Sequence, residues 1–496
     1  MTKAKLFVER LRRVVGTLVG LLLLLVAFLW MVAIVNHLVA WQSPSRVLVA
    51  LLSFALAGGM AVVLPRLGRE MSLRLQDTRA LQVAIVLVVL MFLLRLGLAF
   101  ALQTAQISDY GDYRHEARDL VQGKGYYYPW GGYAARPPGY PFLLATAYLV
   151  SGEREWGAMV TDALAGTVLA TAGGVLVWQL AGPVAGLITL GILGFLPVNL
   201  AYTWVSTSEA PFGACLFAGL ALAFLGQRVR RGGLWLLFVS GLVVGYSCLV
   251  RPPGLIPAVL CFLYLVSKAV LVKPKMLLAV LFVVGCSTAI LPWTVRNYRV
   301  LQHFVLISTN GGRVFYATNV VTDPQKGGAY MPETYRCLDT LVPNEADRDR
   351  IGFRWGARYI VSHPATFLQS LPHRFAGMFD QHDWAASYAF EQASRKAPEA
   401  VARVCVALSN LGYWFIPLFA IISGRATLRM LRASGMALLI GASYVTWVLM
   451  SLFFEAFQRA QYPYFLMPLM LTLAATLSEG ARPSQPLSGA RVQTGA

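Results

Sequence analysis

Long apolar runs separated by polar connections dominate the chain, and this pattern predicts a bundle of membrane-spanning helices. A helix needs roughly 20 consecutive apolar residues to cross a bilayer. About twelve stretches come close to that length and are predicted as spans, namely residues 14–38, 47–64, 81–102, 159–180, 184–200, 210–226, 234–250, 255–272, 276–292, 401–422, 434–454 and 461–477. We therefore expect an all-α polytopic membrane protein. Its first span is retained, because it is too long for the apolar part of a signal peptide.

The apolar stretch Tyr140–Val150 is too short for a span. A helix of this length covers only about half of the hydrocarbon core. A crossing here would also move the basic run 227–233 to the opposite side of the membrane. We predict a short re-entrant or interfacial helix, whose backbone must be covered by protein if it enters the membrane.

Composition and charge agree with a membrane protein and suggest its orientation. Hydrophobic residues make up 57% of the chain and charged residues 13%, against about 25% charged in a typical soluble domain. The net charge of +19 gathers in short connections on one side, at Arg66, Arg69, Arg74, Arg79, Arg228, Arg230, Arg231, Lys268, Lys273, Lys275, Arg425, Arg429 and Arg432. Because short cytoplasmic loops are rich in Lys and Arg, we predict cytoplasmic N- and C-termini, in a bacterial inner or plasma membrane. The basic excess is then expected to contact anionic membrane lipid rather than nucleic acid.

Two long segments fall on the outer side and divide the chain. We predict a first membrane part (1–292), whose outer loop 103–158 carries the candidate chemistry, and an extracytoplasmic domain (293–400). A second membrane part (401–478) and a disordered cytoplasmic tail (479–496), rich in Pro, Gly and Ser, complete the chain.

The segment 108–140 of the first outer loop combines acids with many aromatic residues. A helix over Asp109–Val121 would place Asp109, Asp112 and Glu116 on one face. A carboxylate at the mouth of a membrane bundle is a candidate general base for a lipid-borne substrate. The alternative is a helix start stabilised by the helix dipole. The neighbouring Tyr and Trp residues suit a sugar surface or an ordinary interfacial aromatic belt.

Three ionisable residues lie in or at the ends of spans. Glu209 stands at the outer end of a span, where it should face the cavity of the bundle rather than lipid. We weigh a functional and a structural role for it equally. Arg95 and Asp162 lie within spans, and we expect them to form a buried ion pair that stabilises the bundle.

Further candidate contacts for an anion follow the span 276–292. Arg296 and Arg299 could bind a phosphate, or could extend to lipid headgroups. The turn Asn310-Gly311-Gly312 could present backbone N–H groups to an anion, or could form a tight hairpin turn.

The sequence gives little support for a metal or disulfide site. Asp380, His382 and Asp383 are close in sequence but lack a defined fourth ligand, so we predict no metal site. We expect no required cofactor and leave a role for a divalent metal open. The six cysteines show no disulfide framework and no zinc spacing.

Several segments between about 105 and 315 form an ordered set. They are Asp109, Tyr113, Ala117 and Gly123, then Arg136-Pro137-Pro138-Gly139-Tyr140-Pro141, Ser208-Glu209, Leu249–Leu255, Leu291–Arg299 and Ser308–Gly312. Together they resemble the dolichyl-phosphate-mannose–protein mannosyltransferase-like (PMT-like) family of C-type (GT-C) glycosyltransferases. The chain departs from that family at Tyr110, where many relatives carry a second acid. It also has two additional spans before the loop, an even number that preserves the topology.

The resemblance implies an inverting hexosyl- or pentosyltransferase. It would move a sugar from a polyprenyl-phosphate-linked donor to a glycan, lipid or protein acceptor on the outer face. By this analogy Asp109 is the general base, with Asp112 and Glu209 as supporting acids. The implied donor-phosphate contacts are Arg136, Arg251 and Arg296, and the implied substrate loop contains Tyr113, Asn310, Gly311 and Gly312.

Two rival functions remain at the level of the sequence. A transporter or flippase of a lipid-linked envelope intermediate could use the same acids and arginines. Against it, the chain shows no paired repeats, and its ionisable residues gather at the outer mouth rather than at the midplane. A scaffold without catalysis would tolerate the loss of every outer acid.

Overall fold

The computed structural model describes residues 3–480 except 42–43, 75–76, 129–131, 230–231, 272–275, 322, 324, 326–331, 395–396 and 455–460. Nearly all regular structure in the described residues is helical. The helices of the bundle are α1 (Lys3–Trp41), α2 (Pro44–Arg74), α3 (Asp77–Leu102), α6 (Glu155–Ala181), α7 (Pro183–Phe195), α8 (Pro197–Ala201), α9 (Glu209–Gly226), α10 (Gly233–Val250), α11 (Leu255–Leu271), α12 (Met276–Leu301), α18 (Glu399–Ile422), α19 (Gly424–Ala433), α20 (Gly435–Ser451) and α21 (Leu466–Gly480). The other helices are α4 (Asp109–Val121), α5 (Gly139–Ser151), the 3-10 turn η1 (Pro252–Gly254), α13 (Gly311–Asn319), α14 (Pro332–Leu341), α15 (Glu345–Ser362), α16 (Pro364–Phe379) and α17 (Trp384–Glu391).

The helices confirm the predicted polytopic all-α fold. Within the described ranges, eight are long and apolar enough to cross a membrane: α1, α2, α3, α6, α9, α10, α12 and α18. The bent pair α19 and α20, with an angle of 116° between them, could supply a ninth. The other predicted spans coincide with shorter apolar helices, so the count of twelve stays a prediction.

One predicted span is broken into two helices. The run 184–200 forms α7 and α8, which are separated at Leu196. Pro197 has no N–H and disfavours helical backbone at the residue before it, so the helix must restart there. At the chain's end, α21 continues to Gly480, and the rest of the predicted disordered tail lies outside the described residues.

Small residues allow close packing in the bundle. A Cβ on Gly241 of α10 would lie 2.0 Å from the carbonyl oxygen of Phe282 in α12. A Cβ on Gly285 of α12 would lie 2.1 Å from the carbonyl oxygen of Phe238 in α10. In a membrane, such small residues let backbones approach and gain dispersion contacts that lipid cannot match.

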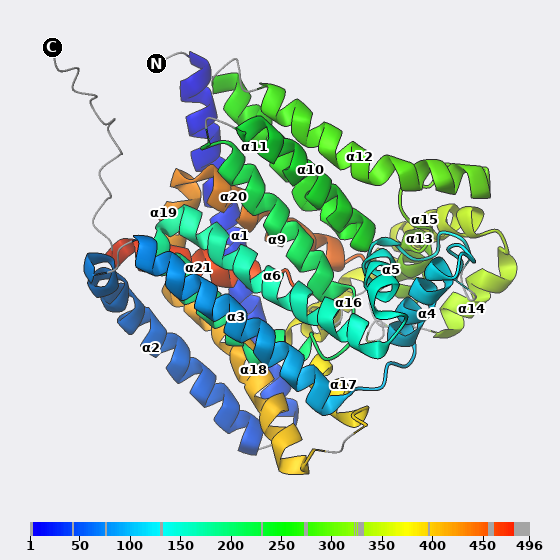
Figure 1. The fold of residues 1–496 in the computed structure, drawn as a ribbon, viewed down its shortest axis with the longest axis horizontal. Helices are drawn as coiled ribbons and strands as arrows, with labels where there is room; N and C mark the ends of the chain where they lie inside the picture. The colour runs from blue at the N-terminus through cyan, green and yellow to red at the C-terminus, as the bar shows by residue number, and fades with distance from the viewer. Residues whose placement is uncertain are drawn as a thin grey trace.

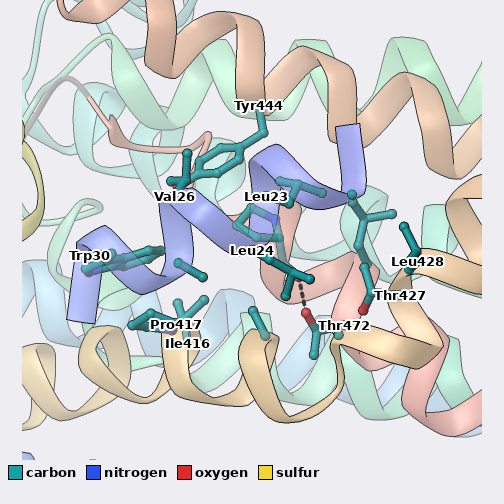
Figure 2. Close-up of a pocket in the computed structure, with 16 residues that line it drawn as sticks. Leu23, Leu24, Val26, Trp30, Ile416, Pro417, Thr427, Leu428, Tyr444 and Thr472 are labelled. Atoms are coloured by element: carbon teal, nitrogen blue, oxygen red, sulfur yellow. Dashed lines mark hydrogen bonds between the residues drawn. The ribbon is translucent and has the colours of Figure 1, made fainter. Parts of the chain in front are cut away.

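An apolar cavity lies among α1, α18, α19, α20 and α21 (Figure 2). Trp30 of α1, Pro417 of α18 and Tyr444 of α20 are among its lining residues. Among the described residues, no acid, Lys, Arg or His lines it. The cavity therefore offers no ionisable side chain for catalysis, and its lining residues serve to pack the bundle.

The helices of the two long connecting segments gather at one end of the bundle, which we call the loop end. Figure 1 shows α4 and α5 there beside α13, α14 and α15, although about 160 residues of sequence separate the end of α5 from the start of α13. Further along the chain, α16 packs against α1, and α17 packs against α18. The loop end thus combines both long segments that the sequence analysis singled out.

Candidate functional site

The site is built on α4, which spans the predicted range Asp109–Val121. The chain turns at Ser108, whose φ of 56° lies in the left-handed region that non-glycine residues seldom adopt. Asp109 and Asp112 then occupy the first helical turn, where carboxylates favour the positive end of the helix dipole. The turn at Ser108 fixes where the helix begins and therefore where these two acids lie.

Arg136 joins the two acids. Its Nη2 lies 2.5 Å from Asp109 Oδ1 and 3.1 Å from Asp112 Oδ2. The guanidinium also lies over the ring of Tyr128, 4.2 Å from its centroid, and donates to the Tyr128 hydroxyl at 3.1 Å. The Arg136 side chain is 11% exposed and that of Asp109 41% exposed. The arginine is thus nearly enclosed, while the carboxylate it holds can be reached from outside.

A second acid–arginine pair lies nearby. Arg251 Nη1 is 2.7 Å from Glu209 Oε1, and it donates to Ser208 Oγ at 3.2 Å. The Glu209 side chain is 2% exposed and that of Arg251 24%. The Glu209 carboxylate is therefore paired and faces protein, and a functional role for it stays a prediction.

Tyr113 connects the two pairs. Its hydroxyl donates to Ser208 Oγ at 3.4 Å, and its ring lies 5.1 Å from the Arg136 guanidinium. Burial raises the pKa of Tyr113, so its hydroxyl keeps its proton. The predicted residues Asp109, Asp112, Tyr113, Arg136, Glu209 and Arg251 therefore form one continuous cluster, which we call the paired-acid site.

The tetrapeptide Arg-Pro-Pro-Gly occurs twice, at 136–139 and at 251–254, and the two copies help to bring these pairs together. A Cβ on Gly139, in the first copy, would lie 2.6 Å from the backbone nitrogen of Val250. The Gly139 carbonyl accepts a hydrogen bond from the Tyr246 hydroxyl at 2.7 Å. Because only glycine fits this approach, the start of α5 packs against the end of α10, directly before Arg251.

Glu116 lies one turn after Asp112 on α4 and is 1% exposed. Its Oε2 accepts a hydrogen bond from the Tyr126 hydroxyl at 3.2 Å. Burial raises the pKa of Glu116 to about 7, although nearby Arg136 opposes the shift. This third acid of the predicted face is therefore much more readily protonated than an ordinary glutamate.

Arg296 holds the loop that carries Arg136. Its Nη1 donates to the carbonyl of Tyr133 at 2.5 Å, and its Nη2 donates to the carbonyl of Tyr126 at 2.7 Å. Its guanidinium also stacks 4.6 Å from the ring centroid of Trp293. These contacts give Arg296 a fastening role, and its predicted contact with a donor phosphate stays a prediction.

Glu345 of α15 fastens the same loop from the other side. It is 8% exposed and accepts hydrogen bonds from the backbone nitrogens of Tyr133 and Ala134, at 2.7 and 3.1 Å. It also accepts from the hydroxyl of Thr309 at 2.9 Å. No local motif in the sequence marks Glu345, because the two loop residues that it holds, Tyr133 and Ala134, lie more than 200 residues away.

The Asn310-Gly311-Gly312 turn starts α13 rather than forming a hairpin. The Gly312 N–H donates to Asp349 Oδ1 at 2.6 Å, so an acid of the protein itself occupies that donor. A Cβ on Gly312 would lie 1.8 Å from the Asp349 carbonyl oxygen. The glycine is required by the close contact of α13 with α15, and a substrate role for the turn stays a prediction.

The segment 380–383 is packed into the bundle. His382 is 1% exposed, and its backbone nitrogen donates to Asn410 Oδ1 at 2.9 Å. Burial lowers its pKa to about 3. Asp383 accepts from Asn410 Nδ2, also at 2.9 Å. Across the described residues, no group of three His, Cys, Asp or Glu side chains is arranged to hold a metal.

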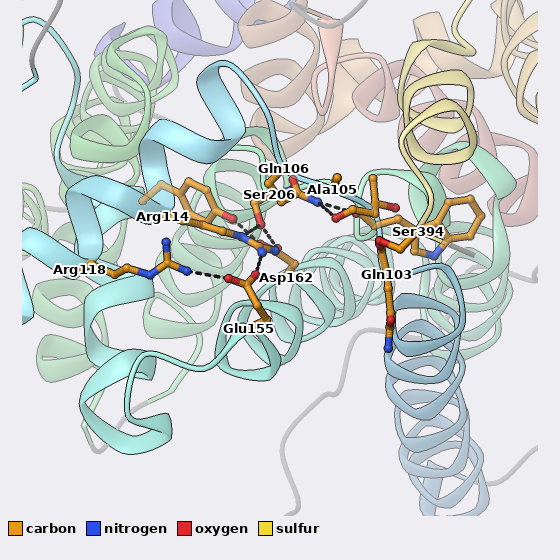
Figure 3. Close-up of polar contacts among 12 residues, drawn as sticks. Gln103, Ala105, Gln106, Arg114, Arg118, Glu155, Asp162, Ser206 and Ser394 are labelled. Atoms are coloured by element: carbon orange, nitrogen blue, oxygen red, sulfur yellow. Dashed lines mark hydrogen bonds and ion pairs between the residues drawn. The ribbon is translucent and has the colours of Figure 1, made fainter. Parts of the chain in front are cut away.

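The expected ion pair between Arg95 and Asp162 is wrong. Asp162 accepts from the Tyr140 hydroxyl at 2.6 Å. It also accepts from the Ser206 hydroxyl at 2.9 Å (Figure 3). Arg95 donates to the carbonyl of Met91 on its own helix at 3.4 Å. Both residues lie inside spans as expected, but position along the sequence does not determine which neighbour each side chain meets.

Comparison with known proteins supports the sequence resemblance. Residues 135–293 match the model of the family described as dolichyl-phosphate-mannose-protein mannosyltransferase. This match confirms the resemblance to PMT-like membrane glycosyltransferases of the GT-C type. It includes Arg136, Glu209 and Arg251 of the paired-acid site, and it supports sugar transfer from a lipid-linked donor as the general activity.

Two solved structures were among those found to be similar. ArnT from Cupriavidus metallidurans, bound to undecaprenyl phosphate, is 16% identical, with a TM-score of 0.40 over 82% of this chain and 78% of that chain. The oligosaccharyltransferase AglB from Archaeoglobus fulgidus, in complex with an inhibitory peptide and a dolichol-phosphate, is 13% identical, with a TM-score of 0.47 over 80% of this chain. The chain covers 50% of AglB. No curated protein matches the sequence.

Proposed function

We propose that the protein is an inverting glycosyltransferase that moves a sugar from a polyprenyl-phosphate-linked donor to an acceptor on the outer face of the membrane. The observation that carries the proposal is the paired-acid site, with half-exposed Asp109 at its rim and two arginines behind it. The family match over residues 135–293 supports the donor class. The identity of the sugar and the acceptor does not enter the proposal.

Asp109 is the proposed general base. The acceptor oxygen attacks the anomeric carbon while its proton passes to the Asp109 carboxylate. The bond between the anomeric carbon and the phosphate oxygen breaks, and its electron pair remains on the phosphate. A single displacement of this kind inverts the anomeric centre. Asp109 suits the role because its side chain is 41% exposed while Arg136 fixes its orientation.

We assign different roles to the two arginines of the paired-acid site. Arg136 already bonds two carboxylates, so we assign it to orienting the base rather than to binding phosphate. Arg251 is more exposed, at 24%, and belongs to the pair with Glu209. We assign it to stabilising the negative charge that develops on the departing phosphate.

The test replaces Asp109 by Asn and measures transfer of labelled sugar from a polyprenyl-phosphate donor in membranes. General bases contribute roughly 10²–10⁴-fold to rate, so a loss of that size is expected. Asp119→Asn is the matched control, because Asp119 lies on the same helix and pairs with Lys124 outside the site. Near-full activity of a normally folded Asp109→Asn variant would remove the base assignment.

The same assay separates the proposal from a transporter or flippase. A flippase moves the lipid-linked intermediate without making a new glycosidic bond. Label that reaches an acceptor is expected here, whereas label that changes membrane face but stays on lipid would favour the rival.

A further inference from the structure

Helix α4 is bound to the bundle along a second face that the proposed chemistry does not use. Arg114, which is 7% exposed, forms an ion pair with Glu155 at the start of α6. One turn later, Arg118 Nη2 lies 2.6 Å from the other Glu155 oxygen. Figure 3 shows both arginines directed at this acid. This second face lies beside the turn that carries Asp109 and Asp112.

The arginine face leads to a buried acid. Arg114 Nε donates to Ser206 Oγ at 3.0 Å, and Ser206 Oγ donates to Asp162 Oδ2 at 2.9 Å. The other oxygen, Asp162 Oδ1, accepts from the Tyr140 hydroxyl at 2.6 Å. Asp162 is 3% exposed. Each of its two oxygens therefore binds a hydroxyl from a different segment of the chain.

Both segments lead directly to the paired-acid site. Ser206 precedes Ser208, which accepts from Arg251, by two residues. Tyr140 follows the Arg136-Pro137-Pro138-Gly139 turn, and its ring packs edge-on against Tyr113 at 5.2 Å between centroids. Asp162 of α6 thus contacts the start of α5 through Tyr140 and the segment before α9 through Ser206, and Ser206 in turn contacts Arg114 of α4.

We propose that Asp162 is a positioning residue that sets the spacing between the Asp109–Arg136 pair and the Glu209–Arg251 pair. The inference rests on the proposed function, and it adds a residue that acts on the two pairs through Tyr140 and Ser206. The side chains of a functional site keep their productive geometry only when neighbouring residues hold them with packing and hydrogen bonds. Here that shell is one carboxylate bonded to two hydroxyls.

Asp162→Asn should disturb the hydrogen bonds to Tyr140 and Ser206. Both hydroxyls donate to Asp162, and an amide nitrogen cannot accept, so in the variant one of the two hydroxyls must rotate and accept from the amide instead of donating to a carboxylate. A displacement of about 1 Å can cost roughly 10²-fold in rate. We expect kcat to fall by about that factor while KM for the polyprenyl donor changes little. Tyr140→Phe should lower kcat by a similar factor, and the double variant should be no worse than either single one.

The experiment pairs kinetics with hydrogen exchange of the full-length protein in detergent. Exchange of backbone amides in α4 and in residues 202–208 should rise about tenfold or more in Asp162→Asn and in Tyr140→Phe. Thr167→Ala is the matched control, because Thr167 is buried on α6 and its hydroxyl bonds the carbonyl of Ala163 on the same helix. It should change neither reading.

The outcomes are distinguishable. Unchanged exchange in α4 for both variants would overturn the positioning role, as would unchanged kcat in a protein that transfers sugar. If the unsubstituted protein transfers no sugar, the proposed function fails, and the exchange data alone still decide whether Asp162 fixes α4. If Asp162→Asn does not fold, Tyr140→Phe, which leaves the acid in place, decides the matter.

Discussion

Arg136 Nη2 lies 2.5 Å from Asp109 Oδ1, although 27 residues separate them in the chain. The loop between them leaves the end of α4 and returns to its start, so that the arginine meets the first helical turn. The contact makes the orientation of the Asp109 carboxylate dependent on Arg136. The arginine at the end of the acidic loop therefore has a structural role in the site.

Replacing Arg136 should therefore weaken transfer without touching the base itself. Arg136→Gln removes the cation that bridges Asp109 and Asp112, and we expect the transfer rate to fall by roughly 10²-fold through misplacement of the base. Arg136→Lys should recover only part of it, because an ammonium lacks the planar fork of a guanidinium. Arg403→Gln, which breaks an exposed helix-surface pair, is the control and should retain full rates. Equal activity of Arg136→Gln and Arg403→Gln would contradict the prediction.

The Glu209–Arg251 pair should show a stability effect that depends on which partner is removed. Arg251→Ala leaves a carboxylate that is 2% exposed without its cation, at a cost of about 3–5 kcal/mol in the free energy of unfolding. The double variant Arg251→Ala/Glu209→Gln should regain much of this loss, because no buried charge is left uncompensated. Thermal unfolding in detergent measures both. A double variant less stable than Arg251→Ala would show that the pair matters through packing instead.

Glu116 should give the protein a stability that falls as pH rises. Its pKa is about 7 in the folded state against an ordinary value of 4.5, so between these values the folded state binds more protons than the unfolded state. Stability is then fully present below about pH 4.5 and declines through pH 7, by on the order of 3 kcal/mol. Glu116→Gln should flatten this dependence.

Unfolding of purified protein across pH 4.5–8 provides the measurement for Glu116. Glu399→Gln, at a position 81% exposed, serves as the control and should leave the slope unchanged. A Glu116→Gln variant whose slope matches that of the unsubstituted protein would rule out this source of pH dependence.

Gly312 should tolerate no side chain. A Cβ there would lie 1.8 Å from the Asp349 carbonyl oxygen, so Gly312→Ala must push α13 away from α15. We expect a loss of about 1–3 kcal/mol in stability, as for overpacked sites. Gly58→Ala on α2 is the matched control, because a Cβ at Gly58 meets nothing within 4 Å. That substitution should be neutral or slightly stabilising. Comparable stability of the two variants in thermal unfolding would contradict the close contact.

Much of the fold could be predicted because a membrane imposes strong local rules. Each predicted span overlaps at least one helix, and Asp109–Val121 and the short helix near Tyr140–Val150 appear at the expected places. A long apolar segment in lipid is expected to form a helix, because its backbone N–H and C=O groups must be hydrogen-bonded within the same segment. A proline was enough to break one predicted span at Leu196, and the sequence did contain that signal.

The sequence by itself determined which residues could act as a base or bind an anion. These are the acids of the first loop, Glu209, and the arginines Arg136, Arg251 and Arg296. Tertiary structure alone decided their partners. It placed Arg136 on Asp109, gave Asp162 two hydroxyls instead of Arg95, and used Arg296 and Glu345 to fasten a loop. The physical reason is that helix formation depends on residues close together in the sequence. The partner of an ion pair depends instead on how helices that are far apart in the sequence pack together. A charged side chain in a bundle must find a partner, but only the packing determines which one.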